Sequence, residues 1–183
     1  MLKATTVSSH HELIQILELQ KKNLKQNISP EEKKVQGFVT MQFTIEMLDR
    51  LHQLAPSIII KDENRVIAYA ITLLLEGRSV YPDLEPMFVN FEKLKWKDKP
   101  LYDYHFYAMG QICVDKEFRG KGLFEELYNG HKEIYGSGFD FIITEISTSN
   151  HRSLRAHEKV GFETIHQYTD EMDEWAVVVW DWK

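Results

Sequence analysis

Residues 113–128, with the sequence CVDKEFRGKGLFEELY, combine the residue types that bind an anion. Two glycines and three basic side chains lie between an apolar run and an amphipathic run. Glycine gives the backbone conformational freedom, and the free N–H groups at the start of a helix attract negative charge. The pattern therefore predicts a phosphate or pyrophosphate site where a strand gives way to a helix. A charged turn without a ligand is the alternative that these residues alone leave open.

Two common phosphate-binding motifs do not explain this turn. No stretch of the sequence matches the P-loop pattern G-x-x-x-x-G-K-[ST]. The dinucleotide fingerprint G-x-G-x-x-G begins well at Gly120 and Gly122 but has Glu125 in place of its third glycine. Because that glycine packs the helix against the sheet, a carboxylate there disfavours dinucleotide binding.

The composition narrows the class of protein. With 183 residues, of which 43% are hydrophobic and 27% charged, the chain has the size and composition of one globular domain over residues 1–183. A net charge of −6 disfavours nucleic-acid binding, and a single cysteine allows no intramolecular disulfide. The sequence has no apolar run near the ~20 residues that span a bilayer, and its start lacks the apolar core of a signal peptide. We therefore expect a cytoplasmic protein that engages neither membranes nor nucleic acids.

Hydrophobic periodicity and cap residues predict the elements that must position the glycine turn. The expected helices are 8–24, 29–34, 44–54, 122–136 and 150–160, and the expected strands are 57–61, 65–75, 104–114, 139–147, 163–169 and 175–182. The proline-containing segment 76–100 is expected to form a loop, a short helix and a second loop. This order indicates an α+β or mixed α/β fold with a mixed sheet.

Two segments, VDKEFRGKGLF and the later NHRSLRAHEKVGF, together resemble the GNAT superfamily of acyl-CoA-dependent N-acyltransferases. The similarity covers roughly residues 104–168. The first family motif is a small apolar strand end followed by R/Q-x-x-G-x-G/A, and the second is an Asn, a small residue three positions on, and an aromatic before K-x-G-F. They fall on Arg119, Gly122 and Phe124, and on Asn150, Ser153, His157 and the run Lys159, Val160, Gly161 and Phe162.

Two positions depart from the family pattern. Phe124 stands where the family has Gly or Ala, so its side chain must turn away from a ligand. His157 stands where many relatives have Tyr, although some branches have His.

The resemblance implies a single domain with a central mixed, mostly antiparallel sheet flanked by helices, and acetyl-CoA as co-substrate. The CoA pyrophosphate would meet the helix N-terminus, and the pantetheine arm would pair with the exposed edge of the preceding strand. A backbone N–H of that edge would hold the thioester oxygen as it becomes an oxyanion. The residues expected to bind the co-substrate are Ile112, Cys113, Val114, Arg119, Gly120, Lys121, Gly122, Leu123, Phe124, Asn150 and Ser153.

Acyl transfer to an amine by direct attack requires two proton transfers. An alkylamine with a pKa near ~10.4 attacks only when neutral, so a base must accept its proton. The resemblance points to Glu145, because Glu-x-x-x-x-Asn recurs at this place in the family; a solvated strand-end carboxylate is the alternative. His157 is the candidate acid for the departing thiolate, with a packing or capping role as its alternative.

Other functions remain as alternatives. Cys113 with His157 and Asn150 could imitate a thiol hydrolase, although a cysteine inside an apolar strand most often packs. A GNAT domain that binds acyl-CoA without turnover, as a sensor or regulatory domain, is the alternative from a different class. The sequence has no H-E-x-x-H pattern and one cysteine, so we expect no metal.

The acceptor is expected to be a small-molecule or peptide amine, and the protein a monomer or homodimer. The resemblance places the acceptor between the N-terminal helices of residues 1–55 and the insert 76–104. The segments expected to contact it are 26–41 and 76–104. The insert carries aromatic residues together with Glu76, Asp83, Glu85 and Asp103, which favours cationic amines. Ordinary core aromatics and solvated carboxylates are the alternative for the insert.

Overall fold

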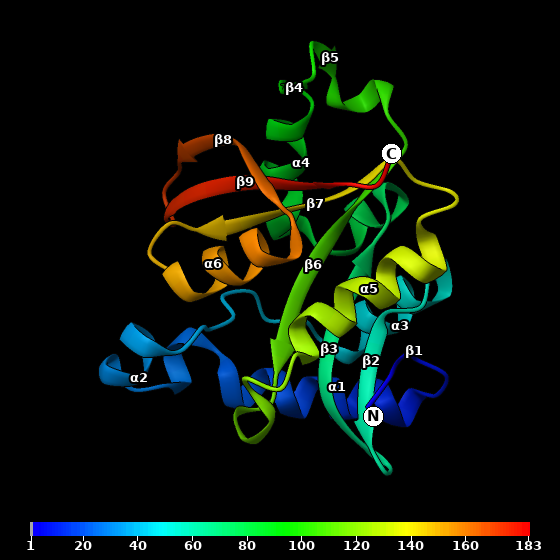
Figure 1. Cartoon of the computed structure of the whole chain (residues 1–183), viewed down its shortest axis with the longest axis vertical. Helices are drawn as coiled ribbons and strands as arrows, with labels where there is room; N and C mark the ends of the chain where they lie inside the picture. The colour runs from blue at the N-terminus through cyan, green and yellow to red at the C-terminus, as the bar shows by residue number, and fades with distance from the viewer. Residues whose placement is uncertain (1) are drawn as a thin grey trace.

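The computed structural model describes residues 2–183, with side chains at all of these except 34 and 35. A seven-stranded sheet crosses the molecule in the order β1-β2-β3-β6-β7-β9-β8 (Figure 1), and β6 and β7 are its one parallel pair. The strands are β1 Ala4–Thr6, β2 Ile58–Asp62, β3 Arg65–Leu73, β6 Phe106–Val114, β7 Phe141–Ser147, β8 Glu163–Thr169 and β9 Glu174–Asp181, and a small hairpin joins β4 Lys95–Trp96 to β5 Lys99–Pro100. The helices are α1 His10–Asn23, α2 Pro30–Val35, α3 Ile45–Leu54, α4 Glu85–Phe91, α5 Leu123–Tyr135 and α6 His151–Val160. The expected fold class is confirmed.

Side-chain caps explain why the helices begin where they do. Ser9 forms a capping box with Glu12 at α1, and Ser29 and Thr44 each accept from the backbone N–H of the third residue of their helix, α2 and α3. The expected helix 8–24 ends slightly earlier, at Asn23, because Leu24 is extended. The short strand β1 and the β4–β5 hairpin were not expected, because two or three residues carry too little periodicity to be recognised.

Helices cover both faces of the sheet and divide the core in two. On one face, which we call the front face, α1, α3 and α4 pack against Tyr69, Ile71 and Ile143. On the back face, Leu127 and Tyr128 of α5 pack against the alternate residues of the same strands. This alternation follows the two-residue period of a strand and assigns each sheet side chain to one face.

The two central strands separate after a short paired stretch. β6 pairs with β7 only at residues 106–108, and beyond that point β6 continues along β3 while β7 continues along β9. The diverging arrows are visible in Figure 1. Within the described chain, the β7-facing edge of β6 is therefore unpaired from residue 109 to 114. The Thr144 hydroxyl donates to the Met109 carbonyl across the start of the gap at 2.9 Å.

The insert 76–104 packs as core rather than as a pocket lining. Phe88 and Phe91 are fully buried, and the Trp96 indole donates to Glu163 of β8 at 3.1 Å. Arg78 bridges Glu85 and Glu92 through charge-assisted hydrogen bonds. Phe88, Phe91 and Trp96 therefore belong to the core, whereas Tyr102 is 40% exposed. The preference for a cationic acceptor stays a prediction.

No helix among residues 2–183 is both long and apolar enough to cross a membrane.

Candidate active site

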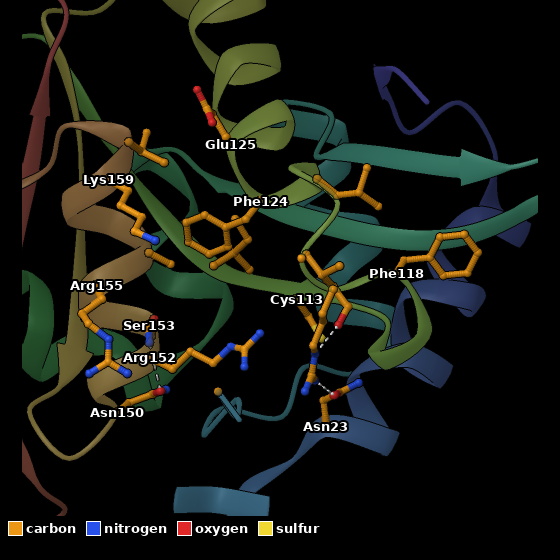
Figure 2. Close-up of a pocket in the computed structure, with 18 of the residues that line it drawn as sticks. Asn23, Cys113, Phe118, Phe124, Glu125, Asn150, Arg152, Ser153, Arg155 and Lys159 are labelled. Atoms are coloured by element: carbon orange, nitrogen blue, oxygen red, sulfur yellow. Dashed lines mark hydrogen bonds between the residues drawn. The ribbon is translucent and has the colours of Figure 1, made fainter. Parts of the chain in front are cut away.

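A cavity of about 500 Å³ lies between the end of β6, the start of α5 and α6, and both family motifs line it (Figure 2). Of the expected co-substrate residues, only Lys121 lies outside this lining. The lining residues used below are Ile112, Cys113, Val114, Arg119, Gly120, Gly122, Leu123, Phe124, Asn150 and Ser153, with Arg152, Arg155 and Lys159 of α6. Glu145 and His157 are not among the lining residues.

The glycine turn has the backbone that an anion cradle needs. Gly120 and Gly122 have φ values of 77° and 79°, a left-handed conformation that favours glycine. No atom lies within 4 Å of a Cβ built at either position, so backbone conformation rather than space calls for glycine. Gly122 caps α5, whose first N–H groups have no intrahelical partner and open toward the cavity wall. Lys121 is exposed, with its ammonium 4.6 Å from the Phe118 ring centroid.

Arg119 holds the turn to the rest of the protein. Its Nε donates to the Val114 carbonyl at 3.1 Å, and its two terminal nitrogens donate to Gln36 and Asn23 at 2.9 and 2.5 Å. Arg119 therefore has a structural role, and its direct contact with phosphate stays a prediction. Arg119 ties the end of α1 and the start of segment 36–39, which we call the strap, to the glycine turn.

Asn150 fastens the other end of the strap. Its side-chain oxygen accepts from the Ser153 N–H at 3.3 Å and caps α6, while its amide donates to the Phe38 carbonyl at 3.1 Å. The strap thus runs under the cavity between the two motifs, and Phe38 and Val39 line it. The spacing of Asn150 and Ser153 in the sequence is explained by the cap alone.

Three basic residues of α6 line the cavity, and none of them was predicted to bind a ligand, although Lys159 belongs to the second family motif. Arg152, Arg155 and Lys159 line the α6 side of the cavity, with Phe124 on the facing helix (Figure 2). Their spacing of three and four residues on an expected helix was the available signal. In a protein of net charge −6, this cluster makes the cavity locally attractive to an anion.

The open edge of β6 offers backbone hydrogen-bonding groups to a ligand. The Asp115 N–H bonds to Ile67 of β3, and residues of a strand alternate between its two edges, so Ile112 and Val114 face the gap. The Val114 carbonyl already accepts from Arg119, whereas the Ile112 peptide groups lie on the unpaired edge.

Cys113 is 7% exposed, and burial raises the pKa of its thiol to about 12. A thiol that stays protonated at neutral pH disfavours the thiol-hydrolase alternative.

Phe124 turns toward the α5–α6 interface, as its bulk requires. Its ring meets Tyr128 and His157 edge-on, with centroids 5.3 and 5.0 Å away.

His157 is 1% exposed. Its Nδ1 donates to the Ser153 carbonyl at 2.8 Å, so its Nε2 accepts from the Tyr128 hydroxyl at 2.6 Å. Burial lowers the pKa of His157 to about 4, so the ring is neutral at neutral pH and lies behind Phe124, away from the cavity.

We expect the substitution His157→Phe to affect stability more than turnover. It leaves the buried Tyr128 hydroxyl without an acceptor, which costs about 1–3 kcal/mol in free energy of unfolding. Urea unfolding measures this loss. The double variant with Tyr128→Phe should recover part of it, because both polar partners are then removed. A tenfold loss of kcat with unchanged stability would instead support the acid role.

Glu145 lies on the front face of β7, opposite Val177 of β9. Tyr168 of β8 donates its hydroxyl to Glu145 Oε1 at 2.8 Å. Burial raises the pKa of Glu145 to about 7, the Tyr168 hydrogen bond opposes this rise, and the nearby charge of Asp170 adds to it. A carboxyl with a pKa near the working pH suits general base catalysis, because it is substantially ionised yet still basic. The alternative of an ordinary solvated carboxylate does not fit this burial.

A second cavity of about 380 Å³ opens on the front face near the same strand ends. It lies between the segment after α1 and the β8–β9 hairpin, and Lys25, Gln26, Lys33, Thr40, Met172, Asp173 and Trp175 line it. Trp175 pairs with Ser147, two residues along β7 from Glu145 and on the same face. The insert 76–104 contributes nothing to this lining, whereas segment 26–41 does.

Residues 2–183 contain no cluster of three or more His, Cys, Asp or Glu side chains that could hold a metal ion.

Comparison with known proteins identifies the family to which this fold belongs. The model of the acetyltransferase (GNAT) family matches residues 16–162. The chain therefore belongs to the GNAT acetyltransferase family and is an acyltransferase. A search of curated proteins found no match.

Solved structures share the fold at low sequence identity. The ribosomal-protein-S18-alanine N-acetyltransferase from Escherichia coli has a TM-score of 0.61 at 13% identity, covering 98% of this chain and 92% of that one. An N-acetyltransferase from Staphylococcus aureus Mu50 has a TM-score of 0.63 at 17% identity, covering 100% and 99%. YncA, a putative acetyltransferase from Salmonella typhimurium with its cofactor acetyl-CoA, has a TM-score of 0.62 at 13% identity, covering 100% and 95%.

Proposed function

We propose that this protein transfers the acetyl group of acetyl-CoA to a primary amine by direct attack. One observation carries the proposal: a single cavity joins the glycine turn, the basic face of α6 and the open edge of β6. These three features match the pyrophosphate, the remaining negative charge and the amide-bearing arm of CoA, in that order. The similar structure that contains acetyl-CoA supports the choice of co-substrate.

The proposed binding uses groups that the cavity already presents. The N–H groups at the start of α5 would receive the pyrophosphate, with Arg155 and Lys159 adding charge-assisted contacts from α6. The Val114 N–H, next to the glycine turn, would pair with a pantetheine amide, as in the addition of a strand. The Ile112 N–H, on the same edge but farther from the turn, would stabilise the thioester oxygen as it gains charge.

The proposed reaction forms one C–N bond and breaks one C–S bond. The neutral amine attacks the thioester carbon, and its excess proton passes to the Glu145 carboxylate. CoA leaves as a thiolate and takes its proton from solvent, because His157 lies behind Phe124 rather than at the cavity. No metal is required for these steps.

We propose that the acceptor reaches Glu145 through the front-face cavity beside Trp175. The cavity and Glu145 share one face of the sheet, and the walls of the cavity are formed by segment 25–40 and the hairpin between β8 and β9. We expect Thr40→Trp, which fills this cavity, to raise KM for the amine severalfold and to leave acetyl-CoA affinity unchanged. Steady-state kinetics and calorimetry measure the two quantities. Thr164→Trp, at an exposed position of β8 outside the cavity, is the matched control. An unchanged KM for the amine in Thr40→Trp would place the acceptor elsewhere.

The function is tested in two stages. Calorimetry first establishes acetyl-CoA binding, and a thiol-release assay then screens a panel of small amines, lysine-containing peptides and peptides with free N-termini. Turnover of any primary amine supports the proposal. Tight acetyl-CoA binding without turnover across the whole panel would favour the sensor alternative, and absence of binding would exclude both.

A further inference from the structure

Tyr168 reaches Glu145 only because β8 contains a bulge. Thr164 pairs with Val178 of β9, but His166 pairs with Val177, so Ile165 is an extra residue in the ladder. Without it, the two-residue alternation would place Tyr168 on the back face. With it, Tyr168 pairs with Trp175 and lies on the front face, where its hydroxyl meets Glu145. The bulge therefore decides that Tyr168 is the residue of β8 that hydrogen-bonds to the candidate base.

The contact leaves one oxygen of Glu145 for chemistry. The Tyr168 hydroxyl donates to Oε1, and among the described residues no hydrogen bond to Oε2 is present. The phenol proton is the donor, because burial and the nearby Glu145 carboxylate raise the pKa of Tyr168 above its usual range. Tyr168 thus holds Oε1 and leaves Oε2 as the oxygen that would accept the amine proton.

Two further groups act on this pair. Asp170, just after β8, is the other charge that acts on Glu145, and it disfavours the carboxylate form. The Asn90 side chain of α4 lowers the pKa of Tyr168 and so opposes part of the rise caused by burial. Tyr168 and Asp170 therefore act on Glu145 in opposite directions, one favouring and the other opposing its ionised form.

We propose that Tyr168 is a positioning residue for the general base, which holds Glu145 by its Oε1 and favours its ionised form. This inference rests on the proposed function, since it presumes that Glu145 accepts the amine proton. It concerns the acyl-transfer step alone and requires no co-reactant beyond acetyl-CoA and the amine.

The test uses two substitutions with opposite expected signs. In Tyr168→Phe the carboxylate loses its donor, so the acid limb of the kcat/KM profile should move to higher pH by about one unit. In Asp170→Asn a neighbouring negative charge is lost, so the same limb should move to lower pH. Asn at position 170 keeps an acceptor for the Met172 and Asp173 N–H groups, which preserves the turn.

A matched control removes a phenol hydroxyl that does not touch Glu145. Tyr104 donates to the Trp96 carbonyl at 2.9 Å and is partly buried on the same side of the sheet. Tyr104→Phe should leave the pH profile where it is. Equal shifts in Tyr104→Phe and Tyr168→Phe would indicate a general structural effect and would overturn the proposal.

A second readout separates this inference from the base role itself. The carboxyl titration of Glu145, followed by carbon-13 NMR and assigned with Glu145→Gln, reports its ionisation without turnover. We expect the titration to move up in Tyr168→Phe and down in Asp170→Asn. If Glu145→Gln retains wild-type activity while these shifts appear, the base role fails and the positioning of Glu145 stands. If the titration does not move in Tyr168→Phe, the inference is wrong whatever the activity of the enzyme.

Discussion

Gly122→Asp should weaken acetyl-CoA binding at least about a hundredfold. The new carboxylate would stand at the start of α5, where the pyrophosphate is proposed to bind. Two unit charges about 4 Å apart near a protein surface interact by about 4 kcal/mol, which is more than a hundredfold in affinity. Calorimetric titration measures the change, and urea unfolding verifies that the variant is folded.

Gly122→Asn separates charge from backbone strain. Asn has nearly the same shape as Asp, and both tolerate the left-handed conformation that Gly122 adopts at a φ of 79°. The neutral variant should therefore share any cost of strain and lose only a few-fold in affinity. If the two variants bind acetyl-CoA equally, electrostatic repulsion is not the cause. If a folded Gly122→Asp protein binds as the wild type does, the proposed pyrophosphate site is wrong.

Glu145→Gln should lower kcat at pH 7 by about 10² to 10⁴-fold, the usual range for loss of a general base. Gln keeps the shape of the side chain and an acceptor for the Tyr168 hydroxyl but cannot accept a proton. In the wild type, a carboxyl pKa of about 7 predicts that activity falls as the pH drops below 7, because the protonated form cannot act as a base. In the variant, this fall in activity below pH 7 should disappear.

The same variant should recover partly at high pH. As the pH approaches the pKa of a lysine-like amine, about 10.4, the neutral nucleophile becomes abundant without help from the protein. A pH–rate profile of both enzymes measures this recovery. Glu133→Gln, the same change at an exposed position of α5, should retain wild-type kinetics at every pH. Equal profiles for Glu145→Gln and Glu133→Gln would remove Glu145 from the mechanism.

Local signals in the sequence were sufficient to predict the helices and strands of the fold and the glycine turn that lines one side of the cavity. Ser9, Ser29 and Thr44 identify helix starts because a capping side chain acts within its own turn. The glycines at 120 and 122 indicate left-handed backbone by residue type alone, since few other residues adopt it. The order of helices and strands then allows few arrangements, and a mixed sheet with helices on both faces is among them.

Contacts between segments far apart in the sequence decided which side chains surround Glu145 and His157. The sequence places Glu145 and Tyr168 23 residues apart, and only the bulge at Ile165 brings them to one face of the sheet. Because a shift of one residue reverses every side chain of a strand, periodicity alone could not find this pair. In the same way, the burial of His157 behind Phe124 depends on how α5 packs against α6, a contact that no local pattern encodes.

The sequence by itself determined a mixed α/β domain with a glycine turn at a helix start, because caps, turns and strand periodicity act over a few residues, and two motifs in it resemble the GNAT superfamily. The tertiary structure alone decided which side chains line the cavity beside β6. In the folded protein, Arg119 and Asn150 hydrogen-bond to the strap, and the basic residues of α6 line the cavity. Burial in the fold also raises the pKa of Glu145. The physical reason is that burial, charge and hydrogen bonding at a site depend on packing between elements far apart in the chain.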